Sequence, residues 1–493
     1  MTTVKTRYGT FDGFVDEKGI KTWLGIPFAQ PPVGKLRWQA PQPLKPSDKT
    51  FDAKKYGNDP IQASMKLGNL VDMPGSENTT QSEDCLTLNI WSRGDGKNKP
   101  VMVWIFGGGF ICGSASEPTY NASNFVFAHD VIIVTINYRV NLFGFMNLAS
   151  VDSSFEDSGY LGLKDQIAAL KWVKENIEAF GGNPDNITVF GESAGSMSTF
   201  FLTIAPDAKG LFQKVIPQSG AVGFYNTPED STQVAKNFME FCGAKTVGDL
   251  MKKSAVELQK SYAGFIENRE MNVADFYPTC DGKFLPKNPL QALKNGAACG
   301  IKILTGTTSD EWRCFMLANE NLFELMRRDP QDISPIFLRY KKQTNEEVYK
   351  TWLKNRPDTS DTYGDFATHV DWRVGQEVAA EYQSEFDDVF YYLFTQIPSP
   401  PLEYLGAFHA LDLPYTFNVP YLEPNPDQRL VKAIQASWAA FAATGNPNNE
   451  FSPYWEKYSA QNRQTMELNA KGCVLHKDLN TENLNSLRYL YED

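Results

Sequence analysis

Apolar runs with the length of buried strands recur along the chain and alternate with stretches of helical pattern. These runs stand at 101–106, 131–136, 187–190, 301–304 and 389–394. They lack the polar alternation of a strand with one face in water. Between the second and third runs, residues 163–180 have an amphipathic helical pattern that ends at Gly181-Gly182. Continuous apolar strands separated by helices predict an α/β fold with a mostly parallel sheet covered on both faces.

Sites in such sheets gather beyond the carboxyl ends of the strands, and the run at 187–190 leads into a candidate nucleophile. Residues 191–195 read G-x-S-x-G with Ser193 at the centre, and a helical pattern follows from Ser196. This motif is typical of a sharp strand-to-helix turn that exposes a nucleophilic serine, with glycines where side chains would not fit. A glycine-rich loop with a capping serine is the alternative. The strand before and the helix after disfavour it.

Three consecutive glycines, Gly107-Gly108-Gly109, follow the run at 101–106. A serine hydrolase needs N–H groups that stabilise an oxyanion, from the residue after the nucleophile and from an earlier loop. A glycine loop can aim its amides freely and suits that role. A phosphate-binding loop would need Lys-Ser or Lys-Thr after the glycines, and Phe110 follows instead.

The order of catalytic groups along the chain narrows the choice of base. With this nucleophile turn, the acid follows the serine and the histidine comes last. His129 precedes Ser193 and does not fit this order. His369 follows no recognisable strand, and His476 lies in the C-terminal tail. His409 follows the last strong apolar run, so the order favours His409.

The acid is expected after a strand between the serine and the histidine. The run at 301–304 leads to two adjacent carboxylates, Asp310 and Glu311. Spacing alone does not choose between them, and a solvated acidic loop is the alternative.

At this point the chain resembles the type-B carboxylesterase family over nearly its whole length, and is closest in character to bacterial para-nitrobenzyl esterases. The family also includes cholinesterases and some fungal lipases. The segment Phe180–Gly195 looks like the family's active-serine signature and is highly specific. Other segments that look like family signatures lie at 24–29, 31–37, 82–91 and 438–447.

The resemblance implies an α/β-hydrolase fold, with residues 1–493 as one domain and helical insertions over the cleft, expected within 312–399. By the family pattern, Glu311 rather than Asp310 is the acid and His409 is the base. With Ser193 they form the triad of a serine carboxylesterase, which hydrolyses neutral carboxylic esters through an acyl-enzyme intermediate.

The family also suggests groups around the triad. The oxyanion donors would be the amides of Gly108, Gly109 and Ala194. Glu192 and Ser219 would lie next to the catalytic residues, Ser219 near the acid. No metal or cofactor is implied.

Two structural ion pairs are also typical of the family. They would join Arg37 to Glu83 and Arg139 to Asp165.

Three positions depart from the family pattern. Many members have His where this chain has Phe106. Trp312 follows the acid where glycine is usual, and it could narrow the site or merely fill it. Asn141 stands where a small residue is usual.

Two absences disfavour cholinesterase activity. Cholinesterases carry a Trp upstream of the 82–91 segment that binds quaternary ammonium by cation–π contact. Here Met73-Pro74-Gly75-Ser76 occupies that stretch. No cysteine precedes Cys85 for the disulfide that those enzymes form.

The sequence disfavours one alternative to esterase activity and leaves others open. A catalytically inactive adhesion protein of this fold is disfavoured because all three catalytic residues are present. Lipase, amidase and carbamate hydrolysis stay open, because variable loops shape the pockets.

Charge and cysteine content limit the partners. The net charge of −12 and the lack of a basic run argue against nucleic acid. We expect a small-molecule ester substrate and no membrane span, and the oligomeric state stays open. The seven scattered cysteines and the absence of an apolar signal core predict a cytoplasmic protein with reduced thiols.

Overall fold

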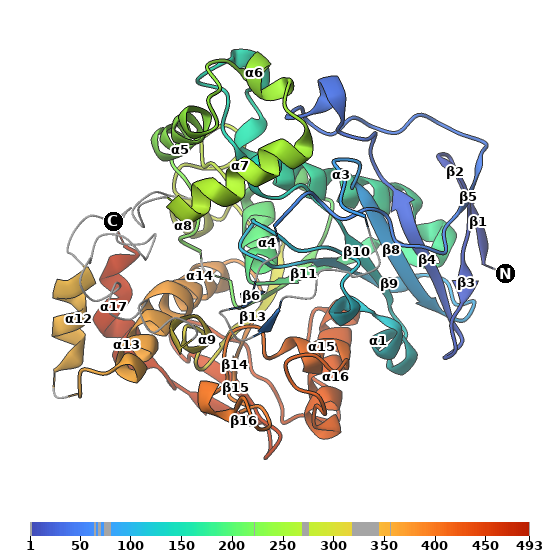
Figure 1. The fold of residues 1–493 in the computed structure, drawn as a ribbon. Helices are drawn as coiled ribbons and strands as arrows, with labels where there is room; N and C mark the ends of the chain where they lie inside the picture. The colour runs from blue at the N-terminus through green and yellow to red at the C-terminus, as the bar shows by residue number, and fades with distance from the viewer. Residues whose placement is uncertain are drawn as a thin grey trace. The chain divides into compact units, whose positions relative to one another are not determined.

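The computed structural model describes residues 2–63, 66–67, 71–72, 80–220, 222–268, 276–317, 345–354 and 356–492. The chain divides into two compact units. Figure 1 shows the ribbon coloured by residue number. Unit 1 comprises Met1–Ser64, Pro74–Gln213 and Tyr225–Lys287. Unit 2 comprises Met65–Met73, Lys214–Phe224 and Asn288–Asp493. A single domain over residues 1–493 stays a prediction.

The large sheet of unit 1 has the strand order β3-β4-β8-β10-β9-β11. Its strands are β3 (Phe14–Val15), β4 (Ile20–Pro27), β8 (Thr87–Arg93), β9 (Lys99–Ile105), β10 (Ile132–Ile136) and β11 (Gly182–Glu192). Strand β9 runs parallel to β10 and β11, whereas β8 is antiparallel to β10 and β4. Residues 101–105 of β9 are fully buried, as expected for a strand covered on both faces. A small sheet of β1 (Thr3–Thr6), β2 (Gly9–Asp12) and β5 (Thr50–Asp52) lies beside it (Figure 1).

Helices connect the strands of unit 1 and in part cover its large sheet. They are α1 (Ser123–Ala128), α2 (Asn141–Phe145), α3 (Leu161–Asn176), α4 (Ala194–Ile204), α5 (Pro228–Phe241), α6 (Val247–Met251) and α7 (Ala255–Asn268). Helix α4 packs on β11 and β9, and α3 packs on β11. Every residue of α4 is buried, so the serine that precedes it is anchored to the core.

The sheet of unit 2 has the order β12-β13-β14-β15-β16. Its strands are β12 (Lys214–Gln218), β13 (Lys302–Thr308), β14 (Val389–Phe394), β15 (Gln464–Leu468) and β16 (Val474–Lys477). The first four are parallel and β16 is antiparallel. The carboxyl ends of the parallel strands therefore share one edge. A separate pair is formed by β6 (Lys66–Leu67) and β7 (Val71–Asp72).

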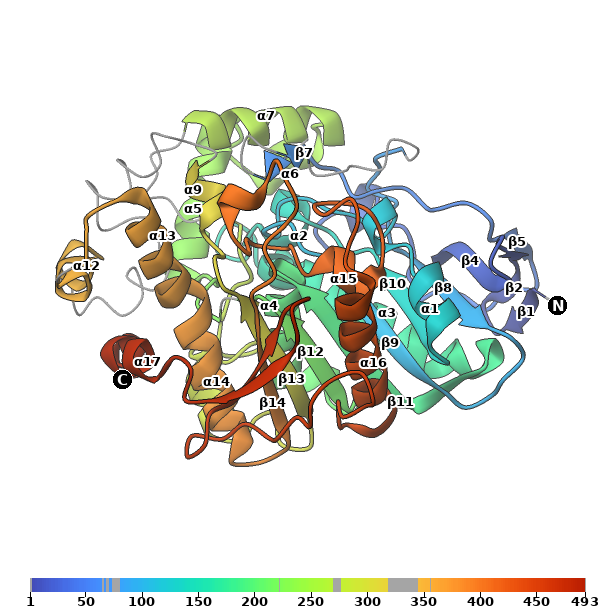
Figure 2. The ribbon, with the colours of Figure 1, turned by 90° about the horizontal axis from the view of Figure 1, so that it is seen from below.

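The helices of unit 2 cover its sheet on both faces. They are α8 (Pro289–Lys294), α9 (Arg313–Leu317), α12 (Asn345–Leu353), α13 (Ser360–Ala367), α14 (Val374–Ser384), α15 (Leu413–Phe417), α16 (Gln428–Thr444) and α17 (Thr481–Leu487). Figure 2 shows α14 and α16 on opposite sides of the sheet. A π-helical turn, Thr368–Arg373, joins α13 to α14.

The predicted strands and the predicted helix are confirmed, with shifts at their ends. The run at 187–190 is the carboxyl half of the longer β11, and the run at 301–304 continues to Thr308 as β13. The helix predicted at 163–180 is α3 followed by a 3₁₀ turn, and Gly181 ends it with φ of 94°. Part of the expected helical segment 312–399 lies outside the described residues, but 345–353 and 360–384 are helical.

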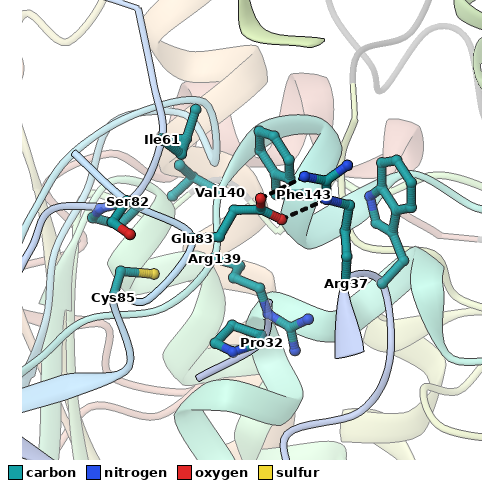
Figure 3. Close-up of a pocket in the computed structure, with 11 residues that line it drawn as sticks. Pro32, Arg37, Ile61, Ser82, Glu83, Cys85, Arg139, Val140 and Phe143 are labelled. Atoms are coloured by element: carbon teal, nitrogen blue, oxygen red, sulfur yellow. Dashed lines mark hydrogen bonds and ion pairs between the residues drawn. The ribbon is translucent and has the colours of Figure 1, made fainter. Parts of the chain in front are cut away.

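Both predicted ion pairs are present. Arg37 and Glu83 pair through two contacts of 2.6 Å, and Arg139 pairs with Asp165 at 2.7 Å. Figure 3 shows the Arg37–Glu83 pair in the wall of a small pocket that Arg139 and Cys85 also line. The buried Arg139–Asp165 pair fixes the chain just after β10 to α3.

Across the described part of the chain, no helix has both the length and the apolar character needed to cross a membrane.

Candidate active site

Ser193 is the single residue that joins β11 to α4, and its backbone is in an unusual conformation. Its φ of 56° and ψ of −123° lie outside the regions that non-glycine residues normally occupy. Its side chain makes no capping hydrogen bond to α4, so the alternative of a plain capping serine is not supported. The turn presents the serine at a helix N-terminus, where the dipole favours developing negative charge.

Packing at the turn explains the two motif glycines. A Cβ atom on Gly191 would lie 2.6 Å from the carbonyl oxygen of Ile105, and one on Gly195 would lie 2.0 Å from the same oxygen. No side chain fits at these distances. The spacing G-x-S-x-G therefore follows from the close approach of the turn to the end of β9.

The predicted oxyanion loop lies against this turn. A Cβ on Gly107 would be 3.1 Å from the Cβ of Ser193. Gly108 and Gly109 have φ of 108° and 63°, conformations that favour glycine. Within the described part of the chain, the N–H groups of Gly108, Gly109 and Ala194 donate to no protein acceptor. These amides are therefore available to a bound oxyanion.

Asn141, one of the departures from the family pattern, holds the far end of the loop. Its N–H donates to the Phe110 carbonyl at 2.6 Å, and its Nδ2 donates to the carbonyls of Ile111 at 3.1 Å and Ile61 at 2.8 Å. Its φ is 48°, which asparagine tolerates better than most residues. Asn141 thus fixes this end of the loop through three hydrogen bonds, one from its backbone N–H and two from its side-chain amide.

Phe106, a second departure, belongs to the core below the loop. Its ring is fully buried and stacks on Tyr138 with the ring centroids 4.2 Å apart. The Tyr138 hydroxyl donates to the Phe106 carbonyl at 2.9 Å. An aromatic residue here supports the glycine loop from beneath.

Buried carboxyl groups lie near Ser193. Glu192 is buried, and a Cβ on Gly107 would lie 2.9 Å from Glu192 Oε2. Burial raises the pKa of Glu117 to about 8, and the carboxylates of Asp59 and Glu192 contribute to the rise. Glu117 is therefore largely protonated at neutral pH, which lowers the negative charge near Glu192.

In unit 2, Glu311 and His409 form a hydrogen-bonded pair. His409 Nδ1 donates to Glu311 Oε2 at 2.6 Å. The second carboxylate oxygen, Oε1, accepts the N–H of Thr308 at 2.8 Å. Glu311 is fully buried and His409 nearly so. A carboxylate held at both oxygens fixes the tautomer in which Nδ1 of the imidazole carries the proton and Nε2 is the basic nitrogen.

Asp310 has a different partner from its neighbour. Its Oδ2 accepts the N–H of Ala407 at 3.0 Å and the hydroxyl of Ser309 at 2.6 Å. The Asp310 N–H donates back to the Ala407 carbonyl at 3.0 Å. Asp310 thus joins the turn after β13 to the loop that carries His409, whereas Glu311 binds the imidazole of His409 itself.

Aromatic rings surround the imidazole of His409. The ring of Trp372 lies 4.4 Å away and that of Phe315 lies 5.4 Å away, centroid to centroid. Trp312, the third departure, packs edge-on against Phe315 at 5.4 Å. Trp312 is therefore one ring removed from the imidazole and supports Phe315.

Ser219 has a left-handed φ of 52°, and its N–H donates to the Gly306 carbonyl at 2.9 Å. Its hydroxyl is buried and has no hydrogen-bond partner within the described residues. The position of Ser219 beside Glu311, which the family resemblance implies, stays a prediction.

The remaining histidines have structural surroundings. His369 Nδ1 donates to the Asp365 carbonyl at 2.8 Å, and His476 Nε2 donates to Glu467 at 2.8 Å. His129 follows the end of α1.

Sequence reasoning missed Tyr138, Trp372 and Arg373. Tyr138 follows the carboxyl end of β10, so the rule that sites gather at strand ends could have found it. Trp372 and Arg373 lie within a helix far along the chain from His409, and no local pattern marks them.

Comparisons with known proteins give one consistent picture. The model of the carboxylesterase family matches residues 1–487. The para-nitrobenzyl esterase of Bacillus subtilis (strain 168) is 38% identical over 483 residues, covering 95% of each chain. An acetylcholinesterase of Bungarus fasciatus is 32% identical over 528 residues, covering 97% of this chain and 84% of that protein. The solved structure of a thermophilic PNB esterase is 35% identical, with a TM-score of 0.85 over 98% of this chain and 99% of that one.

Proposed function

The chain belongs to the carboxylesterase family, and on that premise we propose that its ester hydrolysis uses Ser193 as nucleophile, His409 as base and Glu311 as acid. The predicted α/β-hydrolase fold and the esterase class are confirmed by the comparisons. The observation that carries the residue assignment is the conformation of Ser193. A non-glycine residue at φ 56° costs about 1–3 kcal/mol, and such strain concentrates at functional sites.

In the first step, His409 takes the Ser193 proton as Ser193 Oγ attacks the ester carbonyl carbon. Glu311 stabilises the imidazolium that forms, through the 2.6 Å hydrogen bond. When the tetrahedral intermediate collapses, the imidazolium gives its proton to the leaving alkoxide, and the acyl group stays on Ser193.

The amides of Gly108, Gly109 and Ala194 are the proposed oxyanion donors. Their availability supports this assignment, since none donates to a protein acceptor within the described residues. Removal of one such donor costs about 2.7–4 kcal/mol in hydrolases of this kind. Glycine amides contribute through the backbone, so a variant must move the loop rather than delete a side chain.

In the second step, water replaces the alcohol. His409 removes a proton from the water as its oxygen attacks the acyl carbonyl, and the proton returns to Ser193 Oγ when the acid product leaves. Glu311 has the same role in both steps.

Neutral, moderately apolar esters are the proposed substrates. The net charge of −12 and buried Glu192 disfavour the approach of anionic esters. Aromatic surfaces near His409 suit apolar groups. The stretch 73–76, on which the argument against choline esters rests, lies outside the described residues.

We also propose a cytoplasmic location without a nucleic-acid partner. The seven cysteines all lie among the described residues and form no disulfide there, which supports a reducing compartment.

The test of the nucleophile is Ser193→Ala with Ser196→Ala as the matched control. Ser196 is a buried serine in the first turn of the same helix. Ser193→Ala should lose nearly all turnover of p-nitrophenyl acetate and all labelling by a phosphonylating reagent, while Ser196→Ala keeps both. Full activity in Ser193→Ala, or labelling at another serine, would contradict the assignment.

A further inference from the structure

The helix of residues 360–384 is interrupted near His409 by one π-helical turn. Ser360–Ala367 (α13) and Val374–Ser384 (α14), both labelled in Figure 2, are α-helical. Thr368–Arg373 between them is π-helical. All six residues of the turn are buried. Single π turns inside α-helices are rare and occur frequently at functional sites.

Arg373, the last residue of the turn, binds the backbone that leads to the acid. Its Nη2 donates to the carbonyls of Thr308 at 3.1 Å and Ser309 at 3.0 Å, and its Nε donates to Thr307 Oγ1 at 3.3 Å. Thr308 is also the residue whose N–H binds Glu311 Oε1. The Arg373 guanidinium therefore fixes the carboxyl end of β13, where the Thr308 N–H holds the Glu311 carboxylate.

Two more residues of the same turn contact the acid and base segments. Thr368 Oγ1 accepts the N–H of Trp312, the residue after Glu311, at 3.2 Å. The ring of Trp372 packs on the imidazole of His409 with 4.4 Å between centroids. In a π turn, residues four and five positions apart lie close together on one side, which brings Thr368, Trp372 and Arg373 to the same region.

We propose that the π-helical turn Thr368–Arg373 positions the Glu311–His409 pair, with Arg373 as a positioning residue that acts through the Thr308–Ser309 backbone. This inference rests on the proposed function of Glu311 and His409. Arg373 touches neither reacting atom, so its loss should reduce the fraction of time that Glu311 spends in the productive geometry. Substrate binding should change little.

The surroundings of Arg373 bear on the choice of variants. Its Nη1 lies 3.2 Å from His369 Nε2, and its charge partly offsets the burial that raises the pKa of Glu377 to about 7. Removing the cation therefore also affects folding, and a control for stability is required.

Gln383 provides the matched control. It is fully buried in α14, and its Nε2 donates to two backbone carbonyls, those of Ala298 at 3.0 Å and Ile301 at 2.8 Å. These carbonyls precede β13, whereas Arg373 binds carbonyls at the carboxyl end of the same strand. Gln383→Met thus removes a similar pair of contacts far along β13 from the acid.

The experiment compares Arg373→Gln, Arg373→Lys, Thr368→Val and Gln383→Met by kcat, KM, pH profile and thermal unfolding. Arg373→Gln should lower kcat about 10- to 100-fold with little change in KM, as expected when a supporting contact to a catalytic group is lost. The kinetic pKa of kcat/KM should also decrease, because a displaced Glu311 stabilises the imidazolium less.

Arg373→Lys should recover part of kcat, and Thr368→Val should lower kcat several-fold. Gln383→Met should lower the unfolding temperature only. If Arg373→Gln does not fold, Arg373→Lys and Thr368→Val decide the question.

Unchanged kcat and kinetic pKa in the folded Arg373 and Thr368 variants would overturn the inference while Ser193→Ala stays inactive. If Ser193→Ala is active, the proposed function itself is wrong.

Discussion

Replacing Glu311 by Gln tests the acid most sharply, because the structure predicts how the amide would sit. Glu311 Oε1 accepts the Thr308 N–H at 2.8 Å, and the amide oxygen of Gln would keep that bond. The amide NH₂ would then face His409 Nδ1, where Oε2 now lies at 2.6 Å. A donor facing Nδ1 forces the imidazole proton onto Nε2, the nitrogen that must accept the serine proton.

The expected loss in kcat is about 10⁴-fold, as when the acid of a serine triad becomes an amide. At about 1.36 kcal/mol per factor of ten, this corresponds to roughly 5 kcal/mol of transition-state stabilisation. Asp310→Asn is the matched control. The Asn Oδ1 can still accept from the N–H of Ala407 and the hydroxyl of Ser309. The variant loses mainly the half-exposed pairing with Arg313 at 3.6 Å, worth less than about 1 kcal/mol.

The assay is steady-state hydrolysis of p-nitrophenyl acetate at pH 8, with circular dichroism and thermal unfolding to show that both variants are folded. We expect Asp310→Asn to remain within a few-fold of the parent chain. A large loss in Asp310→Asn together with a small one in Glu311→Gln would refute the assignment and the tautomer argument together.

Two further predictions concern stability and substrate charge. Burial raises the folded-state pKa of Glu117 to about 8, so the folded state binds more protons than the unfolded state between about pH 4.5 and 8. The parent should therefore lose up to about 1.4 kcal/mol of stability per pH unit across this window relative to Glu117→Gln. Urea unfolding of both proteins from pH 5 to 8.5 measures the difference, and a constant difference would contradict the buried neutral carboxyl. For substrates, kcat/KM for p-nitrophenyl acetate or butyrate should exceed that for butyrylthiocholine at fixed ionic strength, and a clear preference for the choline ester would reveal a cation site that this interpretation lacks.

The sequence alone predicted those parts of the fold and site that depend on local patterns. Apolar runs gave the strands because a strand buried on both faces must be apolar throughout. The serine turn was recognisable because steric closure at Gly191 and Gly195 leaves a fixed spacing in the chain. His409 was reached from the order of groups along the chain.

The parts that local patterns could not predict depend on contacts between distant segments. Asp310 and Glu311 are adjacent in one turn, and only their different partners, Ala407 and His409, distinguish them. Family resemblance favoured Glu311 where spacing could not choose, and its role as the acid stays a prediction. Trp372 lies in the π turn Thr368–Arg373, and no local sequence pattern distinguishes this turn from an ordinary α-helix.

The strained turn at Ser193 also has a consequence for the history of such a chain. Glycine adopts φ 56° without steric strain, so Ser193→Gly would relieve the strain and remove the proposed nucleophile in one substitution. Drift without selection for turnover would therefore tend to replace the serine. If Ser193 is the proposed nucleophile, a serine kept at this position indicates selection for turnover at some cost in stability.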